Sequence, residues 1–299
     1  MEFIIKTNLD DTFKTLCNNV VFPCINRFSD KIESLKYFVI GDSETKAFIE
    51  TIDEFSSVLH TESHSENTPM YQVAAKTLEG TDDNGKYCQA IIVKSGLLIG
   101  FVTDLFSLNG NITDQNCTDM QWLGLTTIVH EIGHAVDNQF IFKIRDTVNK
   151  RSAFDLNNPN DREEYIFLSC ISIWSEFFAE SFVYDSFPML CNKVDDDINN
   201  LLECAKNYYG QNIYAADRVY RIIYFFVHLL AQKGEDCYDS LFSPNSPLIC
   251  YKDYLLNIGS ELTKLKNVYP HWNINTDLSP LQQNYTNMLI FEKNKDVIK

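Results

Sequence analysis

The sequence predicts an α+β protein, in which a small β-sheet packs on helices and the C-terminal half is mostly helical. Short apolar runs rich in β-branched residues lie on the N-terminal side, at 37–40 (YFVI) and 87–104 (YCQAIIVKSGLLIGFVTD). Apolar residues at helical spacing dominate after residue 119. The 299 residues are enough for a sizeable core, and 45% apolar with 22% charged residues is an ordinary globular composition.

The N-terminal elements follow from the spacing of apolar residues. Residues 9–20 and 44–59 show the period of a helix, and the run at 37–40 between them predicts a strand. The segment 87–104 predicts a hairpin or two successive strands around Lys94-Ser95-Gly96. The polar stretches 60–68 and 107–120 predict loops.

Helices are expected through the remainder of the chain. The first should run from Asp119 or Met120 to Gln139, with Asp119 as its cap. The second should cover 161–184, opened by a capping box of Asn160 and Glu163 and followed by Pro188. Further helices are expected at 195–208, 213–233 and 252–266.

No Gly- or Pro-rich linker divides the chain, which predicts one domain over 1–299. Residues 1–85 could form an N-terminal lobe of that domain. The core is then expected at 86–235, with a helical C-terminal extension at 236–299.

Charge and cysteine usage exclude several classes of protein. A formal net charge of -16 argues against a nucleic-acid partner, which requires clustered Lys and Arg. Nine cysteines without a CxxC pair indicate reduced thiols. The N-terminus does not resemble a signal peptide, and the most apolar run considered, 219–231, is short and interrupted by Arg221 and His228. We therefore expect a cytoplasmic protein without a membrane segment.

The segment Thr127 to Asp137 (TIVHEIGHAVD) carries the strongest chemical signal. Four residues make just over one helical turn, so His130 and His134 should lie on one face and can bind one Zn²⁺. Glu131 follows about 100° around the helix, near the metal without being a ligand. This is the position of a base for a metal-bound water.

A catalytic zinc usually has three protein ligands and one open position. The predicted helix 161–184 offers Glu176 and Glu180, one turn apart and surrounded by Trp174, Phe177 and Phe178. Carboxylates among aromatics are costly to bury unless a metal or a hydrogen-bond donor meets them. We therefore predict Glu176 as the third ligand and Glu180 as an acceptor for the N–H of a ligating histidine.

The pair HEIGH and WSEFFAES resembles the gluzincin branch of the zincin metallopeptidases. In that branch a helix carries HExxH and a downstream helix supplies a Glu, often within W-x-x-E-x-x-A. Here a single residue separates Trp174 from Glu176, so the E-F-F-A-E core matches better than the full pattern. The resemblance covers about residues 120–185. It implies a zincin-like fold, His130, His134 and Glu176 as zinc ligands, and Glu131 as the catalytic base.

Two features differ from the aminopeptidases of that branch. His134 and Glu176 are 42 positions apart, which is longer, and no Gly-x-Met-x-Asn strand is found. The longer spacing and the preceding small sheet are similar to the ImmA/IrrE-like intracellular metallopeptidases, which clip regulatory proteins. The resemblance therefore implies an endopeptidase acting on a protein or peptide.

Gluzincins also use a Tyr or His to stabilise the oxyanion. The 213–233 helix offers Tyr214, Tyr220, Tyr224 and His228, of which Tyr224 and His228 are the preferred candidates, although core aromatics would show the same spacing. Asp137, one turn after His134, is either a support for the ligands or a helix-end charge. His60 and His64 are expected at the surface.

These residues predict a zinc-dependent endopeptidase in which Glu131 activates the water. The segment 97–103 is expected to be a strand whose edge pairs with an extended substrate. The alternative is a regulatory or binding protein with a structural or degenerate zinc site. A toxin-like or phage-defence effector with a single target protein is a further variant of the peptidase hypothesis.

Overall fold

The computed structural model describes residues 1–30, 32–61, 73–109, 123–145, 154–188, 201–202, 215–271 and 277–297. The chain divides into two compact units, Met1–Gln139 and Phe140–Lys299, and the boundary falls within helix α5 (Leu123–Arg145). The expected loops at 60–68 and 107–120, the cap Asp119 and the helix at 195–208 lie largely outside the described residues.

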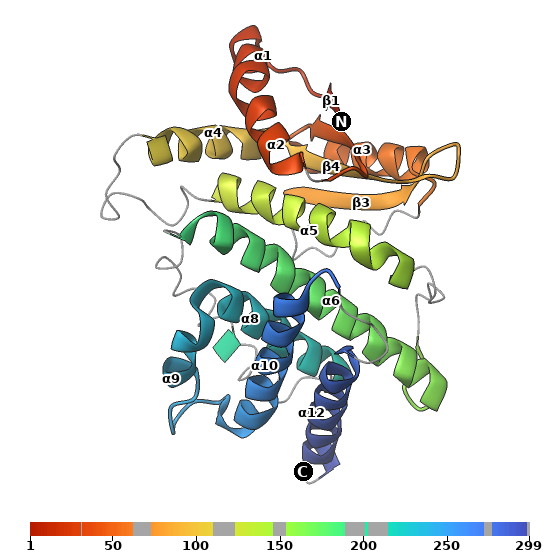
Figure 1. Ribbon diagram of the computed structural model, residues 1–299, viewed down its shortest axis with the longest axis vertical. Coiled ribbons are helices and arrows are strands. Elements are labelled where there is room, and N and C mark those ends of the chain that lie inside the picture. The colour runs from red at the N-terminus through yellow and green to blue at the C-terminus, as the bar shows by residue number, and fades with distance from the viewer. Residues whose placement is uncertain are drawn as a thin grey trace. The chain divides into compact units, whose positions relative to one another are not determined.

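The first unit contains a four-stranded mixed sheet in the order β1-β2-β4-β3 (Figure 1). Its strands are β1 (Glu2–Ile5), β2 (Leu35–Gly41), β3 (Ala75–Thr81) and β4 (Tyr87–Lys94). β1, β2 and β4 are parallel, and β3 pairs antiparallel with β4 at one edge. Strand β2 confirms the expectation at 37–40, whereas β1 and β3 were not predicted.

Alternating side chains give each face of the sheet its own helices. Val39, Leu78 and Ile92 point to one face and form a buried cluster with α3 (Thr45–Val58). On the other face Phe38 lies near Phe3, which stacks on Phe22 of α2 (Phe22–Ser29). A short helix α1 (Asp11–Leu16) and a π-helical turn (Cys17–Val21) precede α2. The predicted helices at 9–20 and 44–59 are therefore present.

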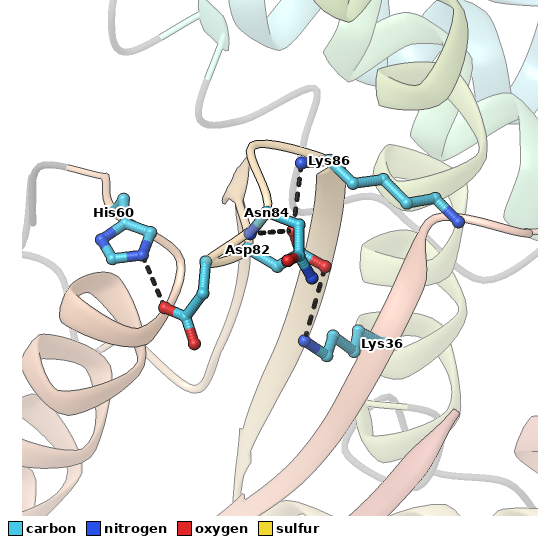
Figure 2. A network of polar contacts seen from close by, with 6 residues as sticks. Lys36, His60, Asp82, Asn84 and Lys86 are labelled. Carbon is cyan, nitrogen blue, oxygen red and sulfur yellow. Dashed lines mark hydrogen bonds and ion pairs between the residues drawn. The ribbon is translucent and has the colours of Figure 1, made fainter.

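A tight turn joins β3 to β4 (Figure 2). Oδ1 of Asp82 accepts hydrogen bonds from the backbone N–H groups of Asn84 and Lys86, and Gly85 supplies the positive φ of 72°. Lys36 lies 3.9 Å from the Asp82 carboxylate. The hairpin thus forms between 75–81 and 87–94, one strand earlier than expected.

The segment 97–103 is not a strand, because it belongs to helix α4 (Ser95–Asn109). Its buried residues Leu98, Phe101 and Val102 follow helical spacing, so one side of the helix faces the core. Oγ of Ser43 accepts a hydrogen bond from the N–H of Gly96 and satisfies a donor in the first turn. The sequence prediction failed because an apolar run has no clear periodicity.

The second unit is helical in its described residues. Its long helices are α6 (Pro159–Ser186), α8 (Ala215–Lys233), α10 (Lys252–Val268) and α12 (Ser279–Val297). The predictions at 161–184, 213–233 and 252–266 are confirmed, whereas α12 was not predicted. The predicted capping box of Asn160 and Glu163 was wrong. The side chain of Asn158 caps α6 by accepting a hydrogen bond from the N–H of Asn160, and Pro159 occupies the first turn.

An ion pair lies inside this unit, between α8 and α12. Arg218 Nη1 is 2.9 Å from Glu292 Oε1, and both side chains are almost fully buried. The hydroxyl of Tyr251 donates to Glu292 Oε2 at 2.6 Å. Lys295 Nζ lies 3.5 Å from the same Oε2, so the buried carboxylate has two charged partners and one neutral donor, as buried charges require.

Among the described helices, Pro159–Ser186 is long and apolar enough to cross a membrane by length and composition. This helix is not the run 219–231 that the sequence suggested as the most apolar. In α6, however, 67% of the most apolar window is buried inside the protein, which is the burial of a core helix.

Candidate metal and catalytic site

Helix α5 brings the two histidines of the HExxH motif together. Leu125, Ile128, Val129 and Ile132 are fully buried, so the helix is anchored along one side, while His130 and His134 are partly accessible. The two Nε2 atoms lie 2.9 Å apart, with the rings nearly perpendicular at 86°. The imidazoles therefore point at a common position.

The spacing of the two Nε2 atoms is close to what one metal ion bound by both imidazoles requires. Two nitrogens bound to one zinc at about 2.0–2.1 Å are about 3.3 Å apart. The observed 2.9 Å separation of the Nε2 atoms is close to that value. Since both Nε2 atoms face the same point, a small increase in the distance between them would accommodate a cation.

Glu131 is held by a residue from the sheet. Oγ1 of Thr77, on β3, lies 2.7 Å from Glu131 Oε2 and 2.9 Å from the backbone oxygen of Glu131. Thr77 was missed in the sequence because its strand was not predicted. Its only signal is a single Thr in the run AKTLEGT, which carries no distinctive pattern.

Ala135, which follows His134 on α5, is also hydrogen-bonded to the sheet. Nε2 of Gln89, a fully buried residue on β4, donates to the backbone oxygen of Ala135 at 2.8 Å. Asp137 is itself fully buried on α5. The predicted helix-end charge is thus an interior carboxylate, and its support of the ligands stays a prediction.

In the second unit, α6 presents Glu176 and Glu180 one turn apart. The neighbouring Trp174, Phe177 and Phe178 are buried, whereas the glutamate side chains are 20% and 18% exposed. The two carboxylates therefore lie at the margin of an aromatic core, and removing them from most of their water requires a partner.

That partner is His228, on α8. Its Nδ1 lies 3.0 Å from Glu180 Oε1, and its Nε2 lies 3.5 Å from Glu176 Oε2. Burial lowers the pKa of His228, but the charge of Glu180 and the hydrogen bonds to both glutamates outweigh burial and raise the pKa from 6.5 to about 10. The two carboxylates therefore favour the protonated form of His228.

The tyrosines on the same helix have distinct surroundings. The ring of Tyr224 packs on His228 with a centroid distance of 4.4 Å. The hydroxyl of Tyr220 lies 2.8 Å from Ser172 Oγ on α6. Tyr214 and His64 lie outside the described residues, and His60 is an exposed partner of Asp83 (Figure 2).

A metal ion could be held by two imidazoles and one carboxylate, those of His130, His134 and Glu176. Such a set suits several divalent transition metals, zinc among them. No family model, curated protein or solved structure matches this chain.

Proposed function

We propose that this protein is a zinc-dependent endopeptidase, with His130, His134 and Glu176 as the metal ligands and Glu131 as the general base. The convergence of the two Nε2 atoms at 2.9 Å on one helix, beside a glutamate fixed by Thr77, is the observation that carries the proposal. A purely structural zinc site would not require a carboxylate at position 131.

Each residue has a defined task in this proposal. Bound zinc would supply a Lewis acid that lowers the pKa of water and polarises the scissile carbonyl. Glu131 accepts a proton from the attacking water at its carboxylate and passes the proton to the leaving nitrogen. Tyr224 is the proposed hydrogen-bond donor to the oxyanion. His228, the other candidate for that task, has two glutamate partners, which favours a different role.

Strand β3 replaces the segment 97–103 as the proposed substrate-binding edge. The bonds Lys94 N–H to Ala74 O and Asp82 N–H to Lys86 O show which residues face β4. Because pairing alternates, the backbone groups of Ala75, Thr77 and Glu79 point away from β4. An extended peptide could add to this edge as a further strand, next to the residue that holds Glu131.

The proposed substrate is a protein or peptide in the cytoplasm. A net charge of -16 favours neither nucleic acid nor an anionic membrane surface as a partner. An endopeptidase is favoured over an exopeptidase because the sequence lacks the Gly-x-Met-x-Asn motif of the aminopeptidases.

Metal analysis and cleavage together test the proposal. Purified wild type should contain about one zinc per chain, Glu131→Gln should retain it, and His134→Ala and Glu176→Gln should lose most of it. Equal zinc in wild type and His134→Ala would refute the metal assignment. New protein N-termini should arise in cells that express wild type and be absent with Glu131→Gln. Identical N-termini in both would favour a regulatory or binding protein.

A further inference from the structure

Glu180 and His228 lie behind the proposed metal ligand Glu176, all within the second unit. Glu180 follows Glu176 by one turn of α6, so their side chains share a face. The imidazole of His228 comes from the neighbouring α8, 3.0 Å from Glu180 and 3.5 Å from Glu176. The three side chains thus form a row in which the histidine is central.

All three side chains of this row are mostly buried. The side chain of His228 is 16% exposed, and the two glutamates are 18% and 20% exposed. The ring of Tyr224 packs on the imidazole at an angle of 43°, which restricts the rotation of His228. The Nδ1 atom of His228 faces the carboxylate of Glu180, and its Nε2 atom faces that of Glu176.

We propose that Glu180 and His228 act as a positioning pair for Glu176, holding its carboxylate in the orientation that binds the metal. The assignment rests on Glu176 being a ligand, as in the proposed function. Glu180 holds the imidazole of His228 through its 3.0 Å contact with Nδ1. His228 in turn directs an N–H at Glu176, as outer partners of metal ligands do.

This role differs from the two roles that the sequence suggested. Glu180 was expected to accept from a metal-ligating histidine, and His228 was expected to donate to the oxyanion. Their 3.0 Å contact makes them partners of each other instead. A donor that is already paired with one glutamate and close to a second is poorly placed to leave both for a substrate oxygen.

Metal affinity of the full-length protein tests the pair without requiring a substrate. Zn²⁺ affinity is measured by competition with a chromophoric chelator. Glu180→Gln and His228→Gln should each weaken binding by roughly 10- to 100-fold, the range for partners that orient a ligand. The double variant should be no weaker than the weaker single variant, because the two residues act as a unit.

Matched controls separate positioning from general effects of substitution. Glu163→Gln, on the exposed side of the same helix, and His60→Gln, which follows α3 and contacts Asp83 of the turn in Figure 2, should both bind Zn²⁺ like wild type. At saturating Co²⁺ the visible ligand-field bands should shift in the Glu180 and His228 variants and stay unchanged in the controls. If Glu180→Gln does not fold, Glu180→Asp keeps the charge on a shorter side chain and should still weaken binding measurably.

The outcomes distinguish this proposal from the one on which it rests. Unchanged affinity and spectra in the Glu180 and His228 variants, with loss of binding in Glu176→Gln, would overturn the positioning pair and leave the zinc site intact. Full binding by Glu176→Gln would instead refute Glu176 as a ligand and overturn both. Strictly additive losses in the double variant would show two independent residues and not a pair.

Discussion

The hydroxyl of Thr77 on β3 bridges the carboxylate and the backbone oxygen of Glu131 on α5, at 2.7 and 2.9 Å. A hydrogen bond to a charged group contributes about 1.5–3 kcal/mol. Thr77→Val, which keeps the shape and removes the hydroxyl, should therefore lower kcat roughly 10- to 100-fold while zinc content stays unchanged.

Thr77→Ser restores the hydroxyl and should recover most of that kcat. Thr81→Val, the same change on the same strand away from Glu131, is the control for altered strand packing. The readout is the initial rate of cleavage of a peptide taken from an identified cleavage site. A Thr77→Val enzyme as fast as wild type would show that this hydroxyl does not position the base.

Metal should stabilise the folded chain if it binds the native state alone. At zinc concentrations a hundredfold above the Kd, the expected gain is about 2.7 kcal/mol. Thermal unfolding of the chelator-treated protein, with and without added zinc, measures it. His134→Ala should show little or none of this gain, whereas an equal gain would indicate that zinc binds elsewhere.

Two glycines at the contact between α4 and α5 should respond oppositely to alanine. A Cβ at Gly124 would lie 2.1 Å from the backbone nitrogen of Phe101, whereas a Cβ at Gly100 would meet Gly124 no closer than 3.5 Å. Gly124→Ala should therefore cost about 1–3 kcal/mol or more, because backbone atoms must move. Gly100→Ala should be neutral or stabilising by up to about 1 kcal/mol. Chemical denaturation compares them, and equal stability of both variants would contradict the close approach of the helices.

The buried carboxylate of Glu292 should be a major determinant of stability. Glu292→Ala leaves Arg218 charged and buried, for which the expected loss is about 3–5 kcal/mol. Glu54→Ala breaks the exposed pair with Lys6 and should cost at most about 1 kcal/mol. Urea unfolding measures both losses. A loss below 1 kcal/mol for Glu292→Ala would mean that Arg218 finds water or another partner.

Cysteine reactivity should follow burial. Burial raises the pKa of the Cys170 thiol far above its ordinary value and that of Cys237 to about 11, so both stay protonated at pH 8. Cys250 is exposed. Iodoacetamide should label Cys250 in the native protein well before Cys170 or Cys237, as followed by peptide mass spectrometry. Equally fast labelling of Cys170 would show that α6 opens readily.

Local sequence determined which side chains share a helical face. The four-residue spacings of His130 with His134, Glu176 with Glu180, and Tyr224 with His228 each place two groups one turn apart, whatever the helix packs against. The existence of α5, α6 and α8 followed from the same periodicity. These features depend only on backbone geometry within a few residues, so they could be predicted.

The tertiary structure decided which residues on different helices and strands contact one another. Strand β3 exists through its pairing with β4, and this pairing brings Thr77 to Glu131. The segment 95–109 is a helix and not a strand because its buried side chains lie on one helical side. Packing of α8 on α6 made His228 the partner of Glu180. The contacts of Thr77 with Glu131 and of Glu180 with His228 join residues about 50 positions apart, and their formation depends on the packing of each unit, which no local pattern encodes.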